Sequence, residues 1–184
     1  MITITILLIA VPVILIIALF RDTAINTTAT ITVDRPCRVV FDYLATLKNQ
    51  ERYNAWLIAG DRINIGYSGQ DGQTGSMLSW TSKHKSSGNG SQRIISLTAP
   101  ETVAIEMTFE QPVPTKAHYR FELLALSDRQ TQVTWIFEGN PKPYYLLRVS
   151  HMLFRLKRRV HHYMELSLRN MKDQLEKERQ IANA

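Results

Sequence analysis

Residues 117–138, AHYRFELLALSDRQTQVTWIFE, carry the clearest strand pattern in the sequence. Apolar and polar residues alternate in each half, and the polar tetrapeptide SDRQ at 127–130 separates the halves. Successive side chains of a β-strand point to opposite faces, so the apolar residues of each half share one face. They are Tyr119, Phe121 and Leu123 in the first half and Val133, Trp135 and Phe137 in the second. The pattern predicts an antiparallel hairpin with one apolar face.

Further strand candidates lie before this hairpin. The segment TVAIEMTFE at 102–110 alternates in the same way, and QPVPT at 111–115 ends it because proline cannot donate to a strand ladder. Shorter candidates are 30–33, 63–67, 76–82 and 92–97, with Asn89-Gly90 as a typical tight-turn pair. Glycines 66, 69, 72 and 75 lie between two strand candidates, which indicates a hairpin loop rather than a phosphate-binding loop.

Helical spacing appears at both ends of this series of strands. PCRVVFDYLATL at 36–47 has apolar residues three and four apart, and Pro36 suits a first helical turn. A long segment at 144–180 carries an apolar stripe, formed by Leu153, Leu156, Val160, Met164, Leu168, Met171 and Leu175. The order is strand, helix, further strands and long helix, which predicts an α+β fold with an antiparallel sheet and its helices on one side.

The order of elements and several strings resemble the START and pollen-allergen-like superfamily, SRPBCC, and its polyketide-cyclase/dehydrase and lipid-transport branch. The matching strings are TITVDRPCRVVFDYLATLKNQERYNAW, GSQRIISLTAPETVAIEM, RFELLALSDRQTQVTWIFEGN and HYMELSLRNMKDQLE. The resemblance implies a helix-grip domain over residues 29–180, in which a curved seven-stranded sheet wraps the C-terminal helix and leaves a pocket. Members bind or carry hydrophobic molecules, and some are cyclases or hydrolases.

Residues 1–20 contain no ionisable side chain and are long enough, as a helix of about 30 Å, to cross a bilayer. We expect a single-pass membrane anchor followed by a short linker at 21–28. A cleaved signal peptide and a buried core helix are the alternatives. Arg21, Arg35 and Arg38 follow the apolar run, and the positive-inside tendency then favours a cytoplasmic domain.

Composition narrows the class of protein and locates its charge. Hydrophobic residues make up 45% and charged residues 21%, as in an ordinary globular domain, and the single Cys37 excludes an internal disulfide. The formal net charge is +6, and all of this excess lies in residues 141–184, which hold 10 Lys/Arg and 4 Asp/Glu. The cations lie opposite the apolar stripe and include Arg148, Arg155, Lys157, Arg158, Arg159 and Arg169.

Anionic lipid headgroups are the partner that these cations favour, because a bilayer is already expected nearby. A solvated face is the alternative, and nucleic acid is disfavoured because the aromatic stacking motifs of RNA-binding sheets are absent. No metal site is expected, since His161 and His162 point about 100° apart on a helix. Cys37 has no histidine nearby in sequence and is not expected to be a nucleophile.

The apolar residues of the predicted inner face fit either a ligand pocket or a filled core. Its expected lining residues are Val103, Ile105, Met107, Phe109, Tyr119, Phe121, Trp135, Tyr163 and Met164, with Trp56 and Trp80 near the rim. His118, Arg120 and Glu122 could form an acid-base group, but the alternation directs them to solvent. No catalytic residue and no cofactor are assigned.

The sequence therefore predicts a membrane-anchored module that binds a hydrophobic, lipid-like or polyketide-like ligand. The alternatives are a cyclase or hydrolase acting on an apolar substrate, and a protein-interaction module with a filled core.

Overall fold

The computed structural model describes residues 12–13, 24–59, 63–82, 88–111, 114–139 and 156–182, with side chains described up to residue 178. The expected anchor at 1–20 lies outside this part, except for Pro12 and Val13, which are helical. Among the described helices, none combines the length and the hydrophobicity that a bilayer crossing requires.

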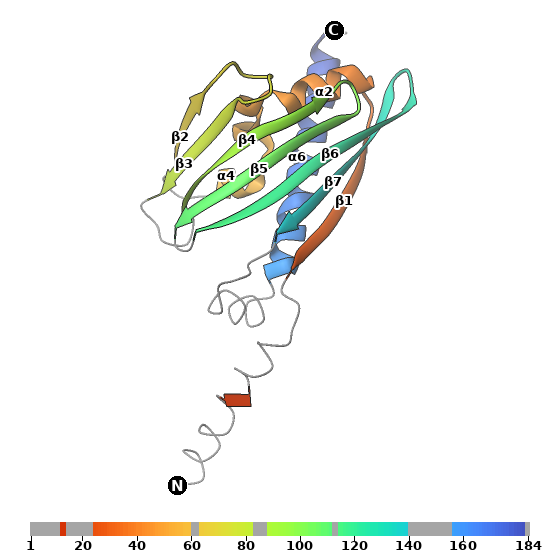
Figure 1. The fold of residues 1–184 in the computed structure, drawn as a ribbon. Helices are drawn as coiled ribbons and strands as arrows, with labels where there is room; N and C mark the ends of the chain where they lie inside the picture. Colours follow the sequence, from red (N-terminus) through yellow and green to blue (C-terminus); the bar gives the residue numbers. More distant parts are fainter. Residues whose placement is uncertain are drawn as a thin grey trace.

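Seven antiparallel strands form one curved sheet (Figure 1). Along the sheet the strand order is β1-β7-β6-β5-β4-β3-β2, so every strand except β1 pairs with its neighbour in sequence. The strands are β1 (Ile25–Val33), β2 (Ile63–Ser68), β3 (Met77–Ser82), β4 (Asn89–Thr98), β5 (Thr102–Gln111), β6 (Thr115–Ser127) and β7 (Gln130–Gly139). The predicted α+β class with an antiparallel sheet is confirmed.

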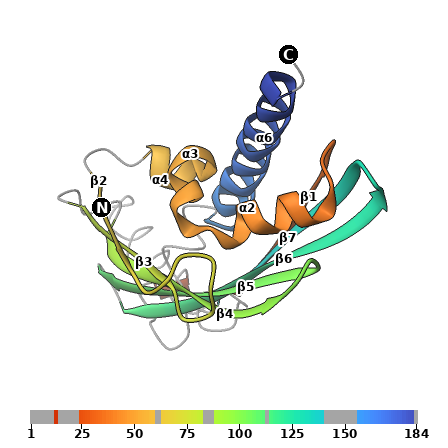
Figure 2. The ribbon, with the colours of Figure 1, turned by 90° about the horizontal axis from the view of Figure 1, so that it is seen from above.

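The helices lie on the concave side of the sheet (Figure 2). They are α2 (Cys37–Ala45), the 3-10 helix η1 (Leu47–Asn49), α3 (Gln50–Tyr53), α4 (Ala55–Ala59) and α6 (Leu156–Ala182). Helix α6 runs beside β1 and crosses the open side of the curved sheet, which is a helix-grip arrangement. The stripe residues Met164, Leu168, Met171 and Leu175 are buried. The earlier part of the predicted helix, 144–155, lies outside the described residues.

Cross-strand pairs build the inner face of the sheet. Phe121 pairs with Val103 on β5 and with Trp135 on β7, and Tyr119 pairs with Ile105 and Phe137. All of these side chains are buried, whereas their neighbours in sequence alternate outward. The hairpin at 117–138 therefore forms with the predicted face inside.

Strand β1 begins earlier than the sequence indicated. It starts at Ile25, inside the segment 21–28 expected as a linker, and Ile25 pairs with Gly139 at the end of β7. Alternation alone did not find this start because Asn26 to Thr30 are mostly polar, and only the partner strand, more than 100 positions away, fixes their conformation.

Gly90 corrects a second expectation. It was expected in a tight turn but lies in β4, where it pairs with Trp80. A Cβ at this position would lie 2.6 Å from Cζ2 of the Trp80 ring and would also clash with the Thr108 carbonyl oxygen. Glycine is therefore required here by close packing. The loop between β2 and β3 is a hairpin loop as predicted, with positive φ at Gly69, Gly72 and Gly75.

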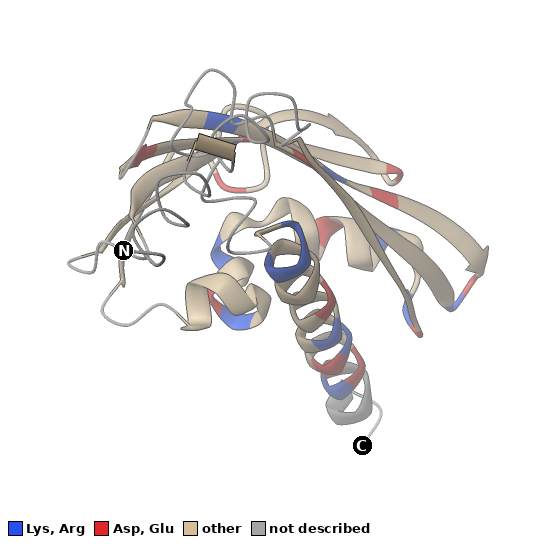
Figure 3. Cartoon of the chain, turned by 90° about the horizontal axis from the view of Figure 1, so that it is seen from below, with Lys and Arg blue, Asp and Glu red and all other residues tan. Residues whose placement is uncertain are grey.

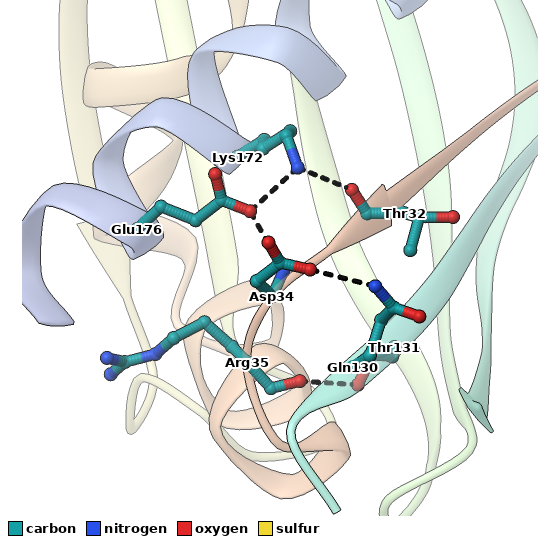
Figure 4. Close-up of polar contacts among 7 residues, drawn as sticks. All are labelled: Thr32, Asp34, Arg35, Gln130, Thr131, Lys172 and Glu176. Atoms are coloured by element: carbon teal, nitrogen blue, oxygen red, sulfur yellow. Dashed lines mark hydrogen bonds and ion pairs between the residues drawn. The ribbon is translucent and has the colours of Figure 1, made fainter. Parts of the chain in front are cut away.

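A polar network joins α6 to the end of β1 (Figure 4). Lys172 donates from Nζ to the Thr32 carbonyl oxygen at 2.8 Å and forms an ion pair with Glu176 at 2.7 Å. Glu176 in turn accepts from the backbone N–H of Asp34 at 2.8 Å. The adjoining contacts to β7 are Gln130 Nε2 to Asp34 Oδ1 at 2.9 Å and Thr131 Oγ1 to the Arg35 carbonyl oxygen at 2.8 Å. These bonds fix the second half of α6 against the sheet edge.

Candidate ligand-binding site

Two aromatic clusters line the inner face. On β6 and β7, the Phe121 and Trp135 rings are 4.8 Å apart and the Tyr119 ring lies 5.4 Å from Trp135. On the same face but on other strands, the Trp80 ring of β3 lies 5.3 Å from the ring of Trp56 on α4 and 5.7 Å from that of Phe109 on β5, in edge-to-face contacts. Such walls suit the flat or chain-like surface of an apolar molecule as well as they suit a core.

A closed ring of three hydrogen bonds lies between the sheet and α3. Gln50 donates from Nε2 to the Tyr119 hydroxyl oxygen at 3.1 Å, and that hydroxyl donates to Gln92 Oε1 at 2.6 Å. Gln92 closes the ring by donating from Nε2 to Gln50 Oε1 at 2.6 Å. Gln50, Gln92 and Tyr119 are all buried. The ring therefore places neutral polar groups inside an otherwise apolar interior.

Neither Gln50 nor Gln92 is among the site residues expected from the sequence. Gln92 shares the inward face of β4 with Ile94, while Arg93 between them is exposed, so the alternation could have identified it. Gln50 lies in a short helical turn 42 positions before Gln92. No pattern in the sequence indicates the hydrogen bond between the two side chains.

Besides Nε of the partly buried Arg35, four neutral buried donor groups have no hydrogen-bond partner among the described residues. They are the hydroxyls of Tyr43 and Tyr53 and the indole N–H groups of Trp80 and Trp135. Leaving a buried donor unsatisfied costs about 1–3 kcal/mol, so such groups are normally paired with protein, water or ligand. The Tyr43 and Tyr53 rings are 5.8 Å apart, which places two of these donors in one neighbourhood.

The hydroxyls of this interior stay protonated. Burial raises the pKa of Tyr53 well above its usual range, and the neighbouring tyrosines Tyr119 and Tyr43 raise it further. Burial also raises the pKa of Tyr119, although the hydrogen bond from Gln50 lowers it in part. Apart from the tyrosines, the buried polar side chains of the described residues are Gln50, Ser76, Gln92, Thr131 and Ser167, and none of these five carries a charge. The described interior therefore offers neutral hydrogen-bonding groups.

His118, Arg120 and Glu122 lie on the outer face of β6, as the alternation predicted. Arg120 pairs with Glu122 at 2.7 Å and with Glu138 at 3.3 Å. Glu106 on β5 pairs with Lys116 at 3.2 Å and with His118 at 3.4 Å. The hydrogen bond from Lys116 is the main reason that the pKa of Glu106 is lowered. These groups form ion pairs on the solvent side and do not converge inside.

All of the expected lining residues except Tyr163 belong to the buried core or pack against it. Those that are buried are Trp80, Val103, Ile105, Tyr119, Phe121, Trp135 and Met164, and those that are partly buried are Trp56, Met107, Phe109 and Tyr163. Trp80 is only 1% exposed, so it belongs to the interior and not to the rim. The aromatic contacts bring Trp56, Trp80 and Phe109 together, and separately Tyr119, Phe121 and Trp135.

The remaining candidates are on or near the surface. Lys157, Arg158, Arg159 and Arg169 are exposed on α6, whereas Arg148 and Arg155 lie outside the described residues. Among the described residues, no group of His, Cys, Asp and Glu has the arrangement of a metal site. Burial raises the pKa of the Cys37 thiol, which donates to the Pro100 carbonyl oxygen.

No protein-family model matches the chain, and no curated protein matches its sequence. Solved structures share its fold. Protein CV1439 from Chromobacterium violaceum gives a TM-score of 0.59 at 12% identity, with 83% of this chain and 97% of that chain covered. Norcoclaurine synthase from Thalictrum flavum, determined with dopamine and hydroxybenzaldehyde, gives 0.58 at 9% identity, with 84% and 87% covered.

A third similar structure is DynU16, a protein of the dynemicin biosynthetic locus. It gives a TM-score of 0.56 at 9% identity, and the match covers 83% of this chain and 47% of that chain. At these identities the likeness concerns the fold. The chain has a helix-grip fold, and the SRPBCC resemblance agrees with it at this coarse level.

Proposed function

We propose that this chain binds an apolar small molecule that carries a neutral hydrogen-bond acceptor, such as a lipid-like or polyketide-like ketone, ester or ether. The observation that carries the proposal is the set of four neutral buried donors without a partner in the described chain, at Tyr43, Tyr53, Trp80 and Trp135. The ligand lies between the sheet and the helices, where its acceptor receives one or more of these donors.

The charge of the interior supports a neutral ligand. A buried carboxylate or ammonium is costly unless an opposite charge accompanies it. Among the described residues no charged side chain is fully buried, and the one unpaired buried atom of a charged group is Nε of the partly buried Arg35. Aromatic rings such as Trp135 and Phe121 supply the apolar contact instead.

The second part of the proposal is that residues 1–20 anchor the chain in a membrane with the domain on the cytoplasmic side. The apolar sequence of this segment and the arginines that follow it support the proposal. Because β1 begins at Ile25, the domain starts no more than about 17 Å of chain from Phe20. A ligand dissolved in the bilayer would then be concentrated beside its site.

The cyclase or hydrolase alternative needs a cluster of ionisable groups in the interior. The ion pairs of the described residues lie on the outer face of β5 and β6, within α2, and along α6 where it meets β1, and none of their members is fully buried. Ligand binding is therefore the function that the described residues favour.

Tryptophan quenching tests the ligand class. Trp56, Trp80 and Trp135 are the three tryptophans of the chain and all lie on the inner side. We expect a brominated long-chain methyl ketone to quench their fluorescence in the full chain in nanodiscs. A brominated alkane of the same length should bind up to about tenfold more weakly, because it lacks hydrogen bonds worth about 1 kcal/mol. The absence of quenching by both compounds would contradict the proposal and favour a filled core.

A further inference from the structure

The first turn of α6 carries three consecutive cations, Lys157, Arg158 and Arg159, here called the basic turn. All three are exposed. No acidic side chain of the described residues forms an ion pair with them, and the first turn of the helix contains no acidic residue. Their charge is therefore uncompensated within the described part of the chain.

The basic turn lies at the end of the domain where β1 begins. Thr27 Oγ1 on β1 lies 3.0 Å from Nδ1 of His161, one turn after the basic turn. Figure 1 shows the starts of α6 and β1 side by side at the same end of the molecule, and Figure 3 shows Lys and Arg coloured at that end of α6. The apolar segment 1–20 therefore joins the domain beside the basic turn.

The carboxylates near this end do not cancel the charge. Glu138, opposite Asn26 in the sheet, pairs with Arg120, and Glu165 lies 3.5 Å from His161. Glu106 is held by Lys116 and His118 on the outer face of the sheet. The three cations of the basic turn are thus available to an external anion.

We propose that the basic turn docks on the anionic lipid headgroups of the bilayer that residues 1–20 enter. This inference rests on the proposed anchoring but not on ligand binding. The chain from Phe20 to Ile25 spans at most about 17 Å, so an anchored domain holds the start of α6 close to the headgroups. Each cation near an anionic leaflet adds about 1 kcal/mol, which makes docking of three cations favourable.

The docking surface includes only part of the set of cations that the sequence predicts to face anionic lipid. Arg169 lies ten residues after Arg159, about 15 Å further along the helix axis, and is not part of the docking surface. The domain then contacts the bilayer with one end, at the starts of α6 and β1, and the opposite end of α6 points away.

Flotation of the full chain with vesicles is the first measurement. Vesicles of phosphatidylcholine alone and of an equimolar mixture with phosphatidylglycerol are compared. We expect the chain to float with both, because residues 1–20 insert. Failure to float with either composition would overturn the inference together with the anchoring, and would leave the ligand proposal intact.

Quenching of a surface label is the second measurement. Cys37→Ser removes the only thiol, and Thr28→Cys places a fluorophore on the exposed side of β1. In nanodiscs whose lipids carry a headgroup quencher, quenching should be stronger with phosphatidylglycerol than without it. Equal quenching in the two discs would overturn the inference.

Two charge variants distinguish the effect of the basic turn from the effect of the net charge of the domain. The triple variant Lys157→Gln/Arg158→Gln/Arg159→Gln should lower the ratio of docked to undocked domain about a hundredfold in anionic discs. The control Arg52→Gln/Arg169→Gln/Lys177→Gln removes the same charge from exposed positions elsewhere and should dock normally. Equal loss in both variants would overturn the inference, as would stronger binding of the basic turn to RNA than to anionic discs.

Discussion

Tyr53 and Tyr119 place similar phenol groups in the same interior but in opposite hydrogen-bonding states. The Tyr119 hydroxyl accepts from Gln50 and donates to Gln92, whereas the Tyr53 hydroxyl has no partner among the described residues. Burial keeps both hydroxyls protonated. At the scale of single residues, one tyrosine is thus committed to the protein and the other remains available to a ligand.

The two tyrosines make a matched pair of variants. Tyr119→Phe should lower the free energy of unfolding by about 1–3 kcal/mol, because it leaves buried atoms of Gln50 and Gln92 without a partner. Tyr53→Phe should leave the free energy of unfolding of the ligand-free chain unchanged or raise it by about 1 kcal/mol, because it removes an unsatisfied donor. Urea unfolding of the two variants checks this difference. Equal destabilisation would mean that the Tyr53 hydroxyl is already paired in the free chain.

Strand β4 depends on the absence of a side chain at Gly90. Gly90→Ala should lower the free energy of unfolding by about 1–3 kcal/mol, because the new methyl group meets the Trp80 ring and the Thr108 carbonyl oxygen. The neighbouring Ser91→Ala serves as the control. Thermal unfolding of both variants provides the measurement, and a Gly90→Ala variant as stable as the control would show that Trp80 moves aside at no cost.

Helix α6 is held to β1 by the network that includes Lys172. Lys172→Met keeps the length of the side chain but loses the bond to the Thr32 carbonyl oxygen and the ion pair with Glu176. We expect a loss of about 1 kcal/mol, since one hydrogen bond to a charged group on a partly exposed surface contributes about that much. Lys177→Met, on the exposed side of the same helix, should change the free energy of unfolding by less than half of this amount. Hydrogen exchange of β1 amides would report the same loosening directly.

At the scale of the whole molecule, the sequence predicts those features that depend on short periods. The alternation at 117–138 and the stripe from Met164 to Leu175 depend on local geometry, so both predictions were confirmed. The start of β1, the strand position of Gly90 and the ring of Gln50 with Gln92 depend on partners distant in sequence. The alternation of β4 could have placed Gln92 on the inner face, but a single sequence gives no sign of its partners Gln50 and Tyr119, so the ring of hydrogen bonds could not be predicted.

The types of the interior residues do not decide between a ligand site and a filled core. Tyr119, Phe121 and Trp135 have the same sequence pattern whether they line a ligand site or fill a core. The proposed ligand would give the N–H groups of Trp80 and Trp135 an acceptor, whereas a filled core would leave them without one among the described residues.

Native mass spectrometry of the full chain, extracted in a mild detergent, shows whether a small molecule occupies the interior. We expect a species heavier by one neutral, lipid-sized molecule, which leaves the protein on mild activation and is depleted in the double variant Tyr53→Phe/Trp135→Phe. A chain that repeatedly shows only its own mass, with the same result for the variant, would contradict the claim that the buried donors receive a ligand.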